Sequence, residues 1–235
     1  MEHHFFFLNE ILGILGFEHL AKYPGHGIHY THVIHSWLII LIMVIGFFLL
    51  GRGIKLLPKK KQVFLELIIE ALEDFMVEIT GPEGRAFFPY IATVFLYIIV
   101  CNLIGLIPGF FSPTANLNTT LSIAICTFVL THVIGVKFHG VKYIKHFLGP
   151  IWPLAPLMLV LELIGHFARV LSLSIRLFGN IFGKEKVLGI LFGMAGLYFA
   201  PLPILVLGIL VSFVQALVFM LLSIIYFTVA MEEAH

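Results

Sequence analysis

Six polar side chains recur at helical spacing between residues 154 and 182, inside sequence that is otherwise strongly apolar. Separated by steps of 4, 3, 3, 4 and 4 residues, they are Glu162, His166, Arg169, Ser172, Arg176 and Asn180. Residues three or four apart lie on the same side of an α-helix, so the spacing predicts one polar stripe. Near Glu162 two interpretations stay open. The stripe is part of an ion path there, or a Glu162–His166 or Glu162–Arg169 pair binds a neighbouring helix.

Arg176 has the narrowest chemistry of the six. An arginine at membrane depth costs about 2.5–3.5 kcal/mol, and its placement there indicates a function. A guanidinium keeps its proton, so Arg176 is unsuited to relaying protons. It can instead attract a carboxylate and hold it ionised, with an attraction of about 4 kcal/mol at 4 Å and an effective dielectric constant near 20. No acidic residue lies within a helical turn of Arg176, so we expect its partner carboxylate on another protein.

Two further polar residues lie in the last third of the chain. Glu185 stands between Lys184 and Lys186, a pattern that fits either a buried carboxylate that loads protons or a solvated turn. Gln215 lies in the middle of the final apolar run. It either hydrogen-bonds across to Arg176 or serves as an isolated amide between helices.

Neither the histidines nor the cysteines predict a metal site. His26, His29, His32 and His35 recur every three residues, and such steps drift by about 60° each around a helix. Four such side chains converge poorly on one ion, so we place these histidines at an interface or a pore mouth. The two cysteines both fall in apolar runs, where they resemble core residues.

The composition is that of an integral membrane protein. Hydrophobic residues make up 60% of the 235 residues and charged residues 11%, whereas soluble domains carry about 25% charged residues. The formal net charge of +1 offers no basic stripe for a nucleic acid. There is also no phosphate-binding glycine loop, so we expect no phosphoryl chemistry.

Apolar runs predict an all-α polytopic membrane protein in one membrane domain, residues 1–235. It has five membrane-crossing helices, one amphipathic surface helix and a long tilted hairpin made by the last two helices. The segments are an external N-terminal segment 1–32, a first span 33–51, the surface helix 62–80, spans 87–111 and 117–136, and the hairpin 154–199 and 204–231. The stretch 62–80 has five acidic residues opposite an apolar face, which suits a membrane surface or another subunit.

The last two helices exceed the roughly 30 Å thickness of the hydrocarbon core. The first of them therefore either breaks between Gly179 and Gly183 or lies strongly tilted. Pro201 and Pro203 are expected to form the turn of the hairpin. Basic residues at 52–61 and 137–145 place those ends in the cytoplasm, with the N-terminus outside and the C-terminus cytoplasmic.

Three motifs resemble the a subunit of F-type ATP synthases, the stator half of the membrane proton channel. They are SLSIRLFGNIFGKE at 172–185, NLIGLIP at 102–108 and FVQALVFMLLSIIY at 213–226. The resemblance implies that Arg176 faces the acidic residue of each rotating ring subunit and that Gln215 packs near that arginine. It implies an outer half-channel near Glu185, Asn102 and Asn180. It implies an inner path near Glu162, His166 and Ser172.

Two positions depart from that family pattern. Gly208 occupies a site where some members carry a histidine or an acid, and Gly105 stands where some carry an aspartate. The family pattern otherwise implies a non-catalytic subunit of a bacterial inner-membrane complex, without cofactor or metal. Its partners would be the c-ring, a b-type peripheral stalk subunit and membrane lipid.

The sequence argues against two other classes of protein. A proton-coupled secondary carrier usually shows internal repeats, and none is found here. A structural membrane anchor would not need the stripe that contains Arg176.

Overall fold

The computed structural model describes residues 31–51, 60–107, 110–140, 143, 155–195 and 202–232. These ranges are helical and contain no strand. The helices are α3 Thr31–Gly51, α4 Lys60–Thr80, η2 Pro82–Phe87, α5 Phe88–Ile104, η3 Pro113–Ala115, α6 Leu117–His139, α8 Ala155–Ala195 and α9 Leu202–Met231. Five helical segments are long and apolar enough to cross a membrane. The predicted all-α polytopic fold is confirmed.

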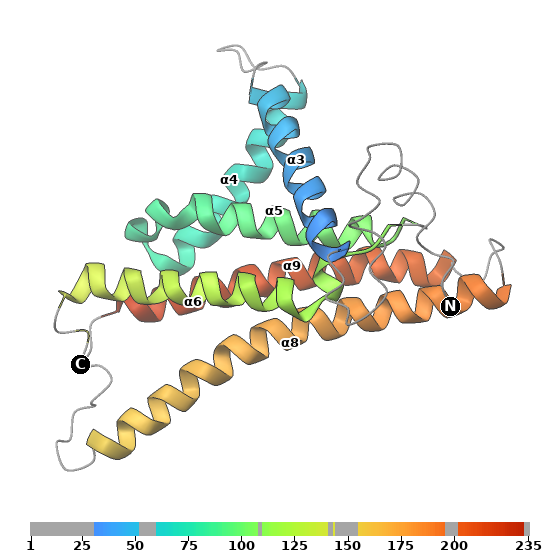
Figure 1. Cartoon of the computed structure of the whole chain (residues 1–235). Coiled ribbons are helices and arrows are strands. Elements are labelled where there is room, and N and C mark those ends of the chain that lie inside the picture. The colour runs from blue at the N-terminus through green and yellow to red at the C-terminus, as the bar shows by residue number, and fades with distance from the viewer. Residues whose placement is uncertain are drawn as a thin grey trace.

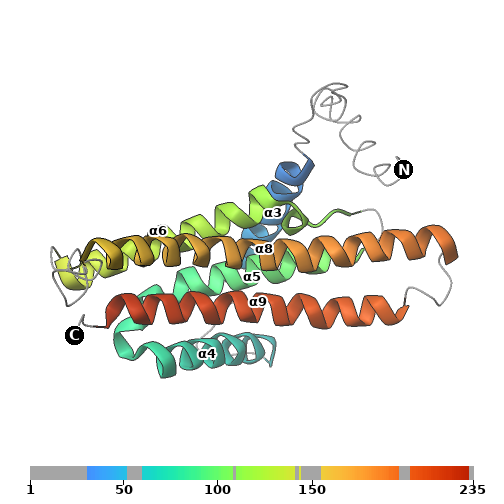
Figure 2. The same cartoon turned by 90° about the horizontal axis from the view of Figure 1, so that it is seen from below.

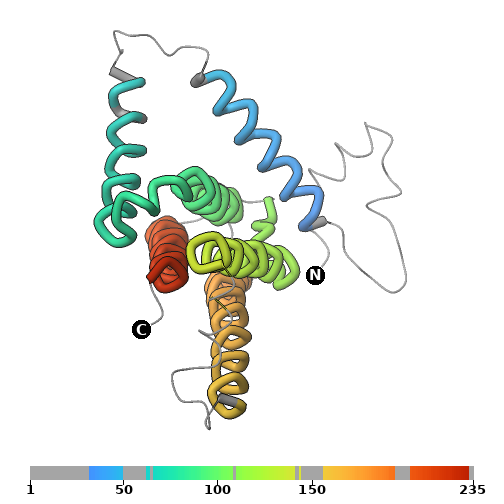
Figure 3. The backbone as a smooth tube through the Cα atoms, turned by 90° about the vertical axis from the view of Figure 1, so that its left-hand side faces the viewer, coloured from blue at the N-terminus to red at the C-terminus, as the bar shows by residue number. Residues whose placement is uncertain are grey.

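The helices α5, α6 and α9 run alongside one another, and α8 packs on α6 and α9 (Figures 1 and 2). Viewed almost along these three helices, α3 and α4 extend from opposite sides of the bundle and come closer together away from it (Figure 3). The core lies where α5, α6, α8 and α9 meet, and Ile98, Leu177 and Phe219 are among its most deeply buried side chains. The bundle therefore provides a fixed frame for α8.

The helix α8 is continuous over 41 residues, so the predicted alternative of a break between Gly179 and Gly183 is wrong. At 1.5 Å per residue it is about 62 Å long, and it bends along its length (Figure 1). Glycine weakens a helix by only about 1 kcal/mol. Burial of the neighbouring Leu177 and Ile181 against the bundle offsets that cost.

The excess length of α8 leaves tilting as the way to fit it in a membrane. The helix α3 has 21 residues, about 32 Å, which suits an upright crossing. It meets the long helices at a steep angle (Figure 1), so α3 and α8 cannot both stand upright in one membrane. This arrangement supports the predicted tilted hairpin.

The helix α9 begins at Leu202 and includes Pro203, so the expectation that Pro203 belongs to the hairpin turn is wrong. Proline is tolerated in the first helical turn because the N–H it lacks there has no partner within the helix. The other predicted turn residue, Pro201, lies outside the described residues.

The helix α5 ends at Ile104, seven residues before the predicted end of that span at residue 111. Backbone hydrogen bonds of 3.0 Å from Leu106 N–H to Leu103 C=O and from Ile107 N–H to Ile104 C=O tighten its end. The predicted breakers Pro108 and Gly109 lie outside the described residues. The chain then folds back through η3, which brings Ser112 and Thr114 into the core.

The helix α4 is amphipathic, as its spacing predicted, and its C-terminal half packs against α9 and α5. Met76 is fully buried there, with Leu72 and Ile79 beside it. An ion pair between Arg85 and Glu73 joins η2 to α4. Val63 and residues 66–70 in the N-terminal half of α4 are exposed, which leaves room for the predicted contact with a membrane surface or another subunit.

Candidate functional site

The polar stripe lies on α8 beside the face that the helix buries. That face is formed by Leu173, Leu177, Ile181 and Leu188. Along the stripe, His166 is buried, Glu162, Arg169 and Arg176 are half-buried, and Ser172 and Asn180 are exposed. The stripe therefore follows the border between the packed side of α8 and its open side.

Arg176 has only a weak polar partner in the described chain. Its Nη2 donates a hydrogen bond to Ser172 Oγ at 3.2 Å, one helical turn away. The ion pairs among the described residues are Arg85–Glu73 and His166–Glu162, so no described carboxylate lies within 4 Å of this guanidinium. The positive charge of Arg176 can therefore pair with a carboxylate outside the described residues.

The open side of α8 next to Arg176 is apolar, and glycines leave part of it without projecting side chains. Ile175 is 54% exposed and Phe182 39% exposed. On the same stretch of α8, a Cβ added to Gly179 or Gly183 would meet no atom within 4 Å. A second helix could therefore approach the backbone of α8 closely beside Arg176.

Gln215 is buried on α9 and hydrogen-bonds to Asn180 rather than to Arg176. Asn180 Nδ2 donates to Gln215 Oε1 at 2.7 Å, while the Arg176 side chain turns back towards Ser172. The predicted Arg176–Gln215 hydrogen bond is therefore wrong. Asn180 makes the hydrogen bond to Gln215 instead, because it lies one turn further along α8 and its short amide side chain reaches α9 directly.

Glu185 and Lys184 point into the bundle, which favours the buried-carboxylate interpretation over a solvated turn. Glu185 Oε1 accepts a hydrogen bond from Ser112 N–H at 2.7 Å. Lys184 Nζ donates to Asn102 C=O at 3.1 Å and to Ser212 Oγ at 3.0 Å. The exposed Lys186 instead lies over the ring of Phe182, 5.2 Å from its centroid. These bonds connect α8 with η3, α5 and α9.

Asn102 is fully buried at the centre of this second polar cluster. Thr114 Oγ1 donates to Asn102 Oδ1 at 2.6 Å, and Asn102 Nδ2 donates to Ser212 C=O at 3.4 Å. Ser112 Oγ donates to Cys101 C=O at 2.9 Å. Sequence reasoning found Asn102 and Glu185 but missed Lys184, Ser112, Thr114 and Ser212. Isolated hydroxyls in apolar sequence carry no spacing signal.

The two departures from the family pattern both border this cluster. A Cβ on Gly105 would stand 2.6 Å from Ser112 Cβ and 2.9 Å from Glu185 Oε1. A Cβ on Gly208 would stand 2.6 Å from Leu106 Cδ2 and 3.2 Å from Lys184 Cδ. Side chains from α8 and from the 105–112 turn thus fill the space that larger residues would need.

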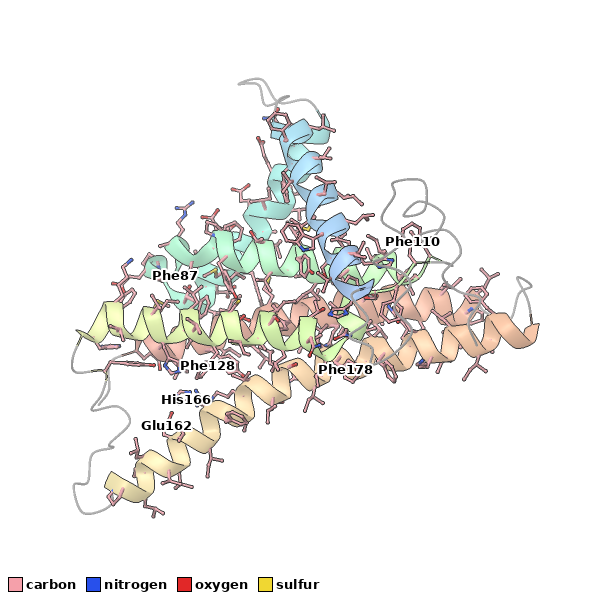
Figure 4. All side chains as sticks on the ribbon, viewed as in Figure 1. Phe87, Phe110, Phe128, Glu162, His166 and Phe178 are labelled. Carbon is pink, nitrogen blue, oxygen red and sulfur yellow. The ribbon has the colours of Figure 1, made fainter. Side chains whose placement is uncertain are left out.

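Glu162 and His166 form a separate polar group at the other end of the stripe. His166 Nε2 lies 3.2 Å from Glu162 Oε1, close enough for an ion pair when the histidine is protonated. Phe128 of α6 makes an edge contact with the His166 ring of α8, with centroids 5.8 Å apart, and the two residues are labelled close together in Figure 4. This group and the Glu185 cluster therefore lie on opposite sides of Arg176, 14 residues before it and 9 after it. Within the described ranges no group of three His, Cys, Asp or Glu side chains could hold a metal ion.

Comparison with known proteins agrees with this geometry. The family model described as ATP synthase A chain matches residues 33–228. This chain belongs to that family. It is 54% identical over 235 residues to the ATP synthase subunit a of Desulfosudis oleivorans, and the match covers the whole of both chains. The ATP synthase subunits a of Syntrophobacter fumaroxidans and Geotalea daltonii are each 52% identical to it, again over the full length of both chains.

Membership of the ATP synthase A chain family argues against the alternative of a stand-alone carrier. The five candidate spans make the chain a multi-pass membrane protein. The family match includes all of the described polar groups on α5, α8 and α9.

Proposed function

We propose that this chain is the proton-translocating stator subunit of the membrane sector of an F-type ATP synthase, and that it performs no covalent catalysis itself. The observation that carries the proposal is Arg176. It is a permanent cation without a described carboxylate partner, and it borders an open apolar face. A ring carboxylate passing that face would be attracted to the guanidinium and held ionised there.

The two polar groups on either side of Arg176 act as two half-channels. On the outer side, protons reach the ring carboxylate through the polar atoms around Glu185, Asn102 and Asn180. A carboxyl that has gained a proton is neutral and can enter lipid, so the ring turns away from the stator. On the inner side, the returning carboxyl releases its proton towards Ser172, His166 and Glu162.

The Arg176 charge separates the two half-channels. A fixed cation repels a proton that would pass straight from one polar group to the other, so each proton must travel on the ring. The membrane potential supplies about 2.3 kcal/mol per charge per 100 mV for this movement. Asn180 and Gln215 hold α8 and α9 together one turn from the arginine and thereby fix its position.

The partners follow from the exposed surfaces. The c-ring takes the open side of α8, and lipid covers the exposed apolar side chains of α3. A b-type peripheral stalk subunit holds the stator in place. The basic residue Lys137 at the end of α6 supports a cytoplasmic position for that end, and the proposed orientation has the N-terminus outside and the C-terminus cytoplasmic in a bacterial inner membrane. The chain is one membrane domain without cofactor or metal.

The direct test is Arg176→Ala in the assembled complex, in inverted membrane vesicles. We expect loss of ATP-driven proton pumping and of ATP synthesis, with the amount of complex unchanged. The matched control is Arg85→Ala, which removes an exposed arginine of η2. Normal pumping by the Arg176→Ala complex would overturn the proposal, because no other described residue supplies this fixed charge.

A further inference from the structure

Four titratable side chains stand in series between α8 and the chain just beyond α6. Glu162 Oε1 lies 3.2 Å from His166 Nε2. The His166 ring meets the His132 ring of α6 at an angle of 66°, with centroids 4.9 Å apart. His132 Nδ1 lies 2.8 Å from the hydroxyl of Tyr143. The family resemblance gives a role to Glu162 and His166 only.

Tyr143 is held in this series by close packing on α6. Its side chain is buried, with 7% exposed. A Cβ on Gly135 would stand 2.2 Å from Tyr143 Cε2, so the ring lies directly against the backbone of α6 at that glycine. Gly135 is one helical turn from His132, which places the phenol oxygen at the histidine. A larger residue at 135 would displace the ring.

We propose that His132 and Tyr143 are proton-transfer residues of the inner half-channel, carrying protons between the Glu162–His166 pair and the cytoplasmic water beyond α6. This inference rests on the function proposed above. A proton that reaches Glu162 passes to His166 and then from a ring nitrogen of His166 to a ring nitrogen of the neighbouring His132. His132 gives one proton to the phenol oxygen of Tyr143, and the phenol gives its own proton to water. One proton enters at Glu162 for each that leaves at Tyr143.

The charges around the series suit transfer of one proton at a time. Burial raises the pKa of Tyr143, the charge of Glu162 raises it further, and Arg169 lowers it. The phenol therefore stays protonated and relays by accepting and donating together. The positive charge of Arg169 also acts on His132. When one histidine of the pair carries an extra proton, its positive charge repels a second proton on the other histidine. The pair therefore passes protons on and does not store them.

The experiment compares two Tyr→Phe substitutions in the whole complex. Tyr143→Phe removes only the hydroxyl at His132. Tyr90→Phe removes a phenol hydroxyl that also bonds to α6, at 2.9 Å from Thr127 Oγ1, but lies outside the series. In inverted vesicles stripped of the catalytic sector, the buffer sets the pH at the cytoplasmic face and passive proton flow is measured against it.

We expect Tyr143→Phe to slow proton flow by about a hundredfold, the lower end of what a positioned proton-transfer group contributes. Tyr90→Phe should leave the flow unchanged. His132→Phe should slow the flow and also shift its dependence on cytoplasmic-face pH, while its dependence on pH inside the vesicles stays the same. A residue that merely held α6 and α8 together would not move one pH profile without the other.

Gly135→Ala keeps every titratable group but displaces the Tyr143 ring, and it should slow proton flow as Tyr143→Phe does. If the complex with Tyr143→Phe does not assemble, Gly135→Ala provides the test of the proposed role of Tyr143. Wild-type flow in the Tyr143→Phe complex, or in the Gly135→Ala complex where Tyr143→Phe does not assemble, would overturn the inference. Arg176→Ala in inverted vesicles that keep the catalytic sector separates the two proposals. If it abolishes ATP-driven pumping while Tyr143→Phe matches Tyr90→Phe, only the inner relay fails.

Discussion

Replacing Gly105 with alanine tests whether the turn between α5 and η3 must touch Glu185. The new methyl group would lie 2.6 Å from Ser112 Cβ and 2.9 Å from Glu185 Oε1. Ordinary contacts between such atoms begin near 3.4 Å, so Ser112 must move away by about 0.8 Å. That movement stretches the 2.7 Å hydrogen bond from Ser112 N–H to Glu185 to about 3.5 Å, where it is effectively lost.

The size of the effect follows from that bond. A hydrogen bond to a charged group contributes about 1.5–3 kcal/mol. Each 1.36 kcal/mol is a factor of ten in rate, so proton loading through Glu185 should slow by tenfold or more if this step bears the whole loss. Overpacking adds about 1–3 kcal/mol to the folding cost, so the amount of assembled complex must be measured as well.

The assay is ATP-driven pumping in inverted vesicles, normalised to the amount of complex. The control is Gly46→Ala in α3, where an added Cβ meets no atom within 4 Å and pumping should be unchanged. The double variant Gly105→Ala with Ser112→Gly removes the closest clash but keeps the backbone N–H, and it should recover part of the rate lost by Gly105→Ala. Wild-type pumping by Gly105→Ala would refute the idea that the Ser112–Glu185 contact lies on the proton path.

Three other predictions concern the remaining contacts. Asn180→Leu and Gln215→Leu should each weaken coupled pumping, and the double variant should lose less than the sum, because each single change leaves a partner amide unpaired at a cost of about 1–3 kcal/mol. Additive losses would contradict this pairing. Thr114→Val should lower the thermal stability of the complex in detergent, because it removes the hydroxyl bonded to the fully buried Asn102. Met76→Ala should destabilise the docking of α4 by about 2–5 kcal/mol, measured by thermal unfolding, whereas Leu67→Ala at an exposed site should change little.

Local patterns predicted much of the fold. Hydrophobic runs located the candidate spans, and the spacing of acidic and apolar residues identified α4, because both signals depend on neighbouring residues alone. The stripe on α8 was found for the same reason. The prediction that Pro203 belongs to the hairpin turn was wrong because proline suits both a turn between helices and the first turn of a helix. The continuity of α8 depends on packing of Leu177 and Ile181 against other helices, which local sequence does not encode.

The family resemblance predicted Asn102 and Glu185 of the second polar cluster, but the bonds of the cluster could not be predicted because they join residues far apart in sequence. Ser112 and Glu185 are 73 residues apart, and Asn102 and Ser212 are 110 apart. Only the pairing of α5 with α9, and of η3 with α8, brings them together. The local sequence around the KEK triplet at 184–186 also does not indicate which of its three side chains face the bundle. Two of its side chains turn into the bundle and one turns out, because the steps of a helix rotate successive residues by about 100°.

The length of α8 connects the tilt of the hairpin with the separation of the two half-channels. Glu162 and Glu185 are 23 residues apart, which is about 35 Å along the helix axis. In an upright helix that distance would exceed the roughly 30 Å hydrocarbon core, so both carboxylates would reach water and neither would need a channel. Tilting brings both ends within the membrane and moves them apart sideways, with Arg176 between them. The two polar groups then do not lie directly above one another, so a proton cannot pass straight from one to the other. A carrier moving sideways along α8 is required, and the open face beside Gly179 and Gly183 is where a ring of helices can provide it.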